Sequence, residues 1–115
     1  MSQPSLSILL LGMSPYLVHT VTNRLRAQGI DVGSIVVTNS LSSDAEVARL
    51  VSSKNWNGFI IGKGVEPYRE WYQRLLQIIH NINPNIPMIH SRGPDDGENA
   101  IERQFNVRLP LIRPE

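Results

Sequence analysis

Four short apolar runs recur along the chain, separated by longer segments in which apolar and polar residues follow helical spacing. The runs cover residues 6–11, 34–38, 58–61 and 86–89. A buried strand of a parallel sheet is covered on both faces, so it is apolar throughout instead of at every second residue. The pattern therefore predicts four parallel strands joined by helices in right-handed βαβ units.

This alternation predicts a three-layer, doubly wound α/β fold that resembles the flavodoxin-like architecture. We expect one domain over residues 1–115, with a short four-stranded parallel sheet in the order 2-1-3-4. The tail, residues 107–112, is apolar but interrupted by Pro110. It is predicted to be at most a fifth strand at the sheet edge, because proline cannot donate a ladder hydrogen bond.

Signals for helix ends accompany the first two amphipathic segments. Ser14 and Pro15 form an N-cap and a first-turn proline, and Gly29 is expected to close that helix. Residues 43–46, Ser-Asp-Ala-Glu, read as a capping box. The second helix is predicted to begin there and to end near Lys54.

The third and fourth amphipathic segments carry signals of their own. Pro67 is expected to open the third helix, and Asn83-Pro84 to end it, because proline restricts the preceding residue and lacks an N–H. A short fourth helix is predicted to start within residues 95–98 and to run to about Gln104.

The third helix has an apolar arc wider than one sheet contact requires. Such an excess is typical of a helix that is wedged between neighbours or that meets a partner. With open sheet edges as well, the sequence predicts a homodimer through this helix. The residues expected at that interface are Trp71, Tyr72, Leu76 and Ile79.

Composition and charge limit the classes of partner that the protein is expected to bind. Eleven basic and ten acidic residues leave a formal net charge of +1, so no electrostatic footprint for nucleic acid or an anionic membrane is present. The absence of cysteine excludes thiolate metal sites and a cysteine nucleophile. Residues 1–11 contain no basic segment, and their apolar run is too short to span a bilayer. We therefore expect a soluble, cytoplasmic protein.

Ligands of open parallel sheets bind beyond the carboxyl ends of the strands, where the winding reverses. In the order 2-1-3-4, that point lies between the first and third strands, where the loops 12–15 and 62–67 meet. The loops 38–40 and 90–93 flank it. Two helix N-termini would direct free N–H groups into this crevice, which favours an anion.

The expected ligand is a small anionic metabolite, with no cofactor and no metal. Candidate binding residues are Gly12, Ser14, Lys63, Gly64, Ser91 and Arg92. The same residues fit a simpler interpretation. Glycine and serine are common in strand-to-helix loops, Ser14 also fits the role of a helix cap, and the two cations fit a solvated surface.

A histidine after the fourth predicted strand offers acid-base chemistry, because imidazole titrates near neutral pH. His90 is the candidate catalytic residue and Glu66 the carboxylate that would orient it. The alternatives are that His90 bonds a loop and that Glu66 favours a helix N-terminus.

The sequence lacks the residues that several known kinds of site require. No P-loop occurs, and a lone Gly12 stands where a dinucleotide fold places G-x-G-x-x-G. The architecture resembles response-regulator receivers, but the acidic pair of that family is replaced by Gly12-Met13 and its aspartate by Gly62-Lys63. It is also similar to small phosphotransfer subunits, whose first-loop cysteine is absent. The alternative function is therefore a receiver-like interaction module without catalysis.

Overall fold

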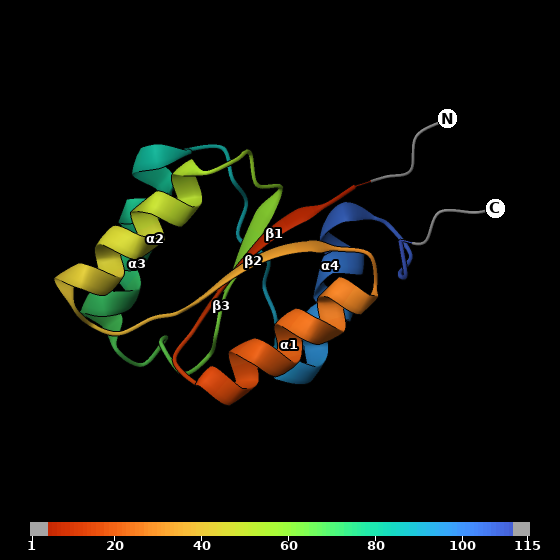
Figure 1. The fold of residues 1–115 in the computed structure, drawn as a ribbon, viewed down its shortest axis with the longest axis horizontal. Coiled ribbons are helices and arrows are strands. Elements are labelled where there is room, and N and C mark those ends of the chain that lie inside the picture. The colour runs from red at the N-terminus through yellow and green to blue at the C-terminus, as the bar shows by residue number, and fades with distance from the viewer. Residues whose placement is uncertain (1–4, 112–115) are drawn as a thin grey trace.

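The computed structural model describes residues 5–111, in which three strands alternate with helices (Figure 1). In chain order the elements are β1 (Ser7–Gly12), α1 (Pro15–Ala27), β2 (Asp31–Val36), α2 (Leu41–Ser52), β3 (Gly58–Ile61), α3 (Arg69–Ile82), a 3-10 turn η1 (Pro94–Asp96) and α4 (Gly97–Phe105). The predicted α/β class with a parallel sheet is confirmed.

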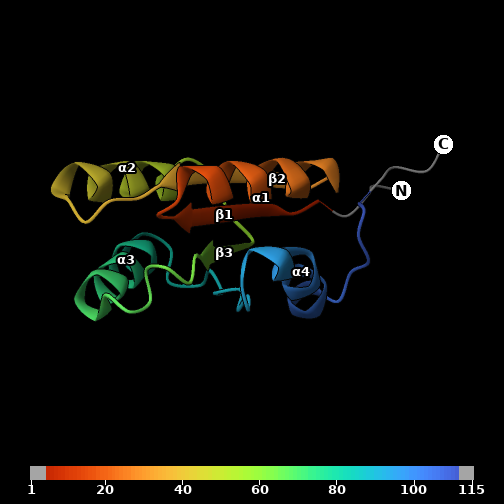
Figure 2. The ribbon, with the colours of Figure 1, turned by 90° about the horizontal axis from the view of Figure 1, so that it is seen from below.

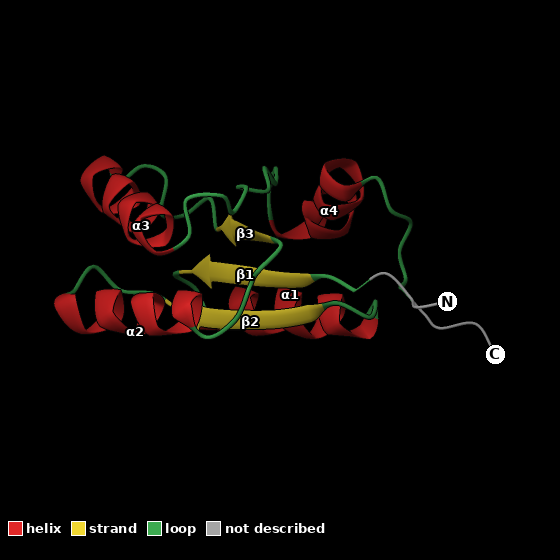
Figure 3. Ribbon diagram, turned by 90° about the horizontal axis from the view of Figure 1, so that it is seen from above, coloured by secondary structure: helices red, strands yellow, loops and turns green. Residues whose placement is uncertain are grey.

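The sheet has three strands in the order β2-β1-β3, and both pairings are parallel (Figure 3). Along β1, the register runs from Ser7 opposite Asp31 to Gly12 opposite Val36. On the other edge of β1, Ile8 lies opposite Gly58. The central strand is therefore β1, and β2 is an edge strand in the described chain.

The predicted fourth strand, residues 86–89, does not form, so the four-stranded order 2-1-3-4 is not confirmed. The segment makes one isolated parallel bridge, between Met88 and Phe59. Phe59 N donates to Pro87 O at 3.1 Å and Ile89 N donates to Phe59 O at 2.8 Å. Pairing stops there in part because Pro87 has no N–H to continue the ladder.

Helices cover both faces of the sheet, which gives three layers (Figures 1 and 2). Strand residues alternate between the two sides, as the pleat requires. Leu9 and Leu11 pack into a core with α2 and α3, whereas Ile8 and Leu10 pack into a second core with α1 and α4. The layering fits the flavodoxin-like kind of fold.

The first helix begins and ends as predicted. Ser14 is the N-cap, and its Oγ accepts from Leu17 N at 3.3 Å. Pro15 is the first helical residue. Gly29 follows the C-cap with φ of +88°, a left-handed conformation that favours glycine.

The second helix begins earlier than predicted. Ser40 is its N-cap, and Ser40 Oγ accepts from Ser43 N at 3.2 Å. The expected capping box at residues 43–46 is therefore wrong. Ser43 lies inside the helix, and its Oγ accepts instead from Thr38 N at 3.0 Å. Several serines near the start of α2 could act as its N-cap, and the path of the chain after β2 determines which of them does.

The second strand and third helix also differ at their starts. β2 begins three residues before the predicted run, at Asp31, and ends two residues before the end of that run, at Val36. An edge strand tolerates a polar first residue such as Asp31. α3 begins at Arg69 rather than Pro67, since residues 62–68 form successive turns. Its end at Asn83 is confirmed.

The described part of the tail, residues 107–111, forms no strand, so the predicted edge strand is not present there. Its apolar side chains, Val107, Leu109 and Leu111, pack against the core of α1 and α4. Leu111 N donates to Gln28 O at 2.6 Å. Residue 112 lies outside the described residues. Across residues 5–111, no helix has the length and apolar character needed to cross a membrane.

Candidate functional site

The carboxyl ends of β1 and β3 lie side by side, as the sequence predicts. Gly62 N donates to Leu11 O at 2.7 Å, directly beyond the paired residues. A Cβ on Gly62 would lie only 3.5 Å from Gly12 Cα, so the two loops leave the sheet in close contact. α1 begins three residues after β1 ends, and its N-terminus therefore borders the same place.

A cavity of about 210 Å³ opens at this junction. One wall is the inner side of α1, with Leu17, Val18 and Val21. The opposite wall belongs to the segment 91–97, of which Ser91, Gly93, Pro94 and Gly97 line the cavity. Gly97 is the first residue of α4. The ends of β1 and β3 form the remaining boundary, so the cavity lies on the face of the sheet covered by α1 and α4.

Five of the predicted binding residues line this cavity. They are Gly12, Ser14, Lys63, Gly64 and Ser91. Both hydroxyl groups have partners within the chain: Ser14 Oγ caps α1, and Ser91 Oγ donates to Gly93 O at 2.7 Å. The polar groups at this site are therefore held in place by the fold.

Three other predicted residues lie outside the cavity lining. Arg92 and His90 are exposed, and the backbone O of His90 accepts from Arg103. Glu66 forms an ion pair with Lys63, and within the described chain no hydrogen bond or ion pair joins it to His90. The acid-base pair of His90 and Glu66 stays a prediction.

Lys63 is the one charged side chain that lines the cavity within the described residues. Its Nζ lies 3.3 Å from Glu66 Oε2, and both side chains are about half exposed, at 55% and 47%. An exposed pair of this kind is weak, because water screens both charges. An anion at the mouth would therefore compete with Glu66 for Lys63.

The wall formed by residues 91–97 is fixed by Asp96. Its carboxylate accepts from Arg103 Nη2 and from Arg92 N, both at 2.9 Å. The Arg103 guanidinium first, and the Arg92 N–H second, lower the pKa of Asp96 to about 2. The same carboxylate thus ties the loop to α4, and it stays ionised over the physiological pH range.

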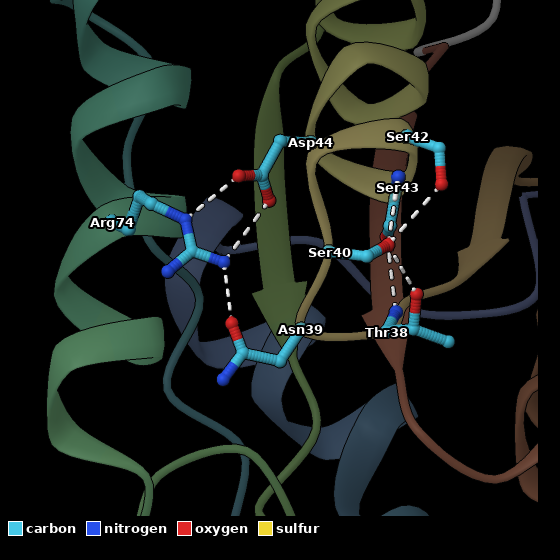
Figure 4. Close-up of polar contacts among 7 residues, drawn as sticks. All are labelled: Thr38, Asn39, Ser40, Ser42, Ser43, Asp44 and Arg74. Carbon is cyan, nitrogen blue, oxygen red and sulfur yellow. Dashed lines mark hydrogen bonds and ion pairs between the residues drawn. The ribbon is translucent and has the colours of Figure 1, made fainter.

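The flanking loop 38–40 does not line the cavity and serves another contact (Figure 4). Arg74 of α3 donates to Asp44 Oδ2 at 2.7 Å and to Asn39 Oδ1 at 2.6 Å. Thr38 Oγ1 lies 2.8 Å from Ser40 Oγ. Arg74 thus joins α3 to α2 and to the loop before it, whereas the contact between Thr38 and Ser40 lies within that loop.

Sequence reasoning did not identify the apolar lining. Met13, Leu17, Val18 and Val21 border the cavity, and none of them is among the predicted site residues. Leu17 follows the helical spacing of the buried Val21 and Leu25 of α1, yet it stays 40% exposed. The exposure of a residue on the apolar side of a helix depends on which element packs opposite it, and the sequence does not show that element.

Among residues 5–111, no group of three or more His, Asp or Glu side chains could hold a metal ion. Comparisons of the chain with protein-family models, with curated proteins and with solved structures found no match.

Proposed function

We propose that this domain binds a small molecule with one anionic group at the carboxyl ends of β1 and β3. The observation that carries the proposal is the cavity, which lies where an open parallel sheet reverses its winding. Lys63 at its lining supplies the positive charge, and the N-terminus of α1 adds a partial one.

The proposal is one of binding. Acid-base chemistry by His90, oriented by Glu66, would require His90 to face the bound molecule, and neither side chain lines the cavity. Ser14 and Lys63 are the expected contacts of the anion, and Gly64 lets the backbone approach it.

The test measures thermal stability in the presence of small carboxylates and inorganic phosphate. A ligand that binds only the folded state raises the melting temperature. We expect Lys63→Ala to reduce the rise and Glu66→Gln to increase it, because the latter frees the lysine. Lys54→Ala is the matched control, since Lys54 is also half exposed and paired with a carboxylate, Asp31. No rise with any anion, or a rise that Lys63→Ala leaves unchanged, would contradict the proposal.

A second candidate function is self-association through α3. Tyr68, the residue directly before α3, is 55% exposed, and Tyr72 and Leu76 of the helix are only partly buried. Trp71 and Ile79, by contrast, are buried against the chain's own sheet, which removes them from any such surface. Sedimentation of the wild type and Tyr68→Lys would decide: a dimer that the substitution weakens supports this candidate, and a monomer at high concentration excludes it.

A further inference from the structure

We infer that the bound molecule is a small aromatic monocarboxylate, whose ring lies between α1 and residues 93–97 and whose carboxylate stays at the mouth beside Lys63. The inference rests on the proposed function and specifies the ligand class. It is drawn from the chemistry of the cavity lining, its size and the position of its single charge.

The lining is apolar apart from three side chains. Leu10, Val21 and Ile60 belong to the buried core on this face, and they border the cavity together with Val18 and Pro94. The polar side chains are Ser14, Ser91 and Lys63, each of which already has a partner within the chain.

An apolar lining of this kind disfavours a ligand whose buried part is polar. A sugar or a nucleobase would exchange its hydrogen bonds to water for contacts with methyl and methylene groups. Each polar group buried without a partner weakens binding, because its hydrogen bonds to water are not replaced. An apolar body meets no such cost, and its burial favours binding in proportion to the apolar area removed from water.

The volume limits that body to one ring or two fused rings. An engineered cavity of about 150 Å³ lined by Leu, Ile and Phe binds benzene. The present cavity is about 210 Å³. Along α1 its lining reaches from Ser14 to Val21, which is roughly 10 Å at the rise of an α-helix. That length suits a phenyl or indole ring carrying a short acid chain.

The single charge of the lining lies at the mouth of the cavity, so only one end of a bound molecule meets it. Met13 and Leu17 are each 40% exposed and line the cavity, so they mark its boundary with solvent. Lys63 is 55% exposed at the same boundary. A single carboxylate can stay hydrated there while the ring is buried, whereas a polyphosphate would find no second cation in the lining.

The experiment titrates the ¹⁵N-labelled protein with four probes: indole, 3-phenylpropionate, acetate and inorganic phosphate. We expect 3-phenylpropionate to bind at least about tenfold more tightly than acetate, because burial of the ring adds more than 1.4 kcal/mol. Amide shifts are expected at Val18, Ile60 and Gly97. Lys63→Ala should weaken 3-phenylpropionate several-fold and leave indole unchanged.

The outcomes separate the two proposals. Acetate or phosphate binding as tightly as 3-phenylpropionate, in a manner that depends on Lys63, overturns the aromatic class and leaves the proposed function standing. Equal affinity for indole and 3-phenylpropionate, independent of Lys63, overturns the anionic function. The absence of binding by all four probes overturns both.

Two filling variants test the location of the ring. Val21→Phe adds bulk within the cavity, and Leu17→Trp adds it at the exposed mouth, where folding tolerates it better. Both should abolish the indole shifts. Leu50→Phe, on the opposite face of the sheet, is the control and should leave them unchanged. Folded variants at positions 17 and 21 that still bind indole with wild-type affinity would overturn the assignment.

Discussion

At the residue scale, one carboxylate holds a wall of the candidate site. Asp96 accepts hydrogen bonds from the Arg92 backbone and from Arg103 of α4, and so fixes the loop that faces α1. Because these donors favour the ionised form, the pKa of Asp96 falls from 3.8 to about 2. A lowered folded-state pKa means that the ionised group stabilises the folded state.

We predict that this stabilisation is complete above about pH 4 and is lost as the pH falls from 4 toward 2, where the folded protein also takes up the proton. Urea unfolding of the wild type and Asp96→Asn should therefore differ most at neutral pH and converge toward pH 2. Asp95→Asn is the control, because the adjacent Asp95 is exposed and makes no ion pair within residues 5–111. A difference that stays constant down to pH 2 would contradict the prediction.

At the scale of elements, α2 and α3 are joined by more than apolar contact. Arg74 Nε donates to Asp44 Oδ2 at 2.7 Å, and Asn39 accepts from the same guanidinium (Figure 4). Asp44 is only 13% exposed, so water competes weakly for its oxygens. Arg74 thereby connects α3 to the loop that precedes α2.

We predict that Arg74→Ala lowers the free energy of unfolding by about 1 kcal/mol, since the pair is partly exposed and the loss leaves Asp44 with fewer partners. Chemical denaturation measures the change. Arg69→Ala on the same helix is the control, because Arg69 is exposed and makes no ion pair in the described chain. Equal effects of the two substitutions would show that the contact adds nothing beyond helix propensity.

At the scale of the whole molecule, stability should be greatest at the centre of the sheet. β1 is hydrogen bonded along both edges and covered by helices on both faces. The segment 86–89 is attached to β3 through one bridge. Regions with few shared contacts open before the rest of a domain does.

We predict that the amides of Leu9 and Leu11 exchange only through global unfolding, and that Ile89 exchanges at least about tenfold faster through local opening. Native-state hydrogen exchange followed by NMR measures both rates. Equal protection of Ile89 and β1 would mean that the segment is a full member of the sheet.

Elements with strong local signals could be predicted from the sequence. The run 58–61 is β3, the pair Ser14-Pro15 starts α1, and Asn83 ends α3. The prediction for the second strand overlaps β2 but begins three residues late, because an edge strand need not be apolar throughout. The fourth strand is wrongly predicted, because an apolar run does not show that Pro87 lacks the N–H needed to extend the pairing beyond one bridge.

The candidate site, too, has features that the sequence predicts and features that depend on tertiary packing. Local sequence placed glycines, a cap and a lysine after β1 and β3, because turns and helix starts depend on a few neighbouring residues. Whether space is left between Val18 and Gly97 depends on how α1 and α4, 79 positions apart at these residues, pack across the sheet. A cavity is volume that distant side chains fail to fill, so only the tertiary structure decided that the site is apolar.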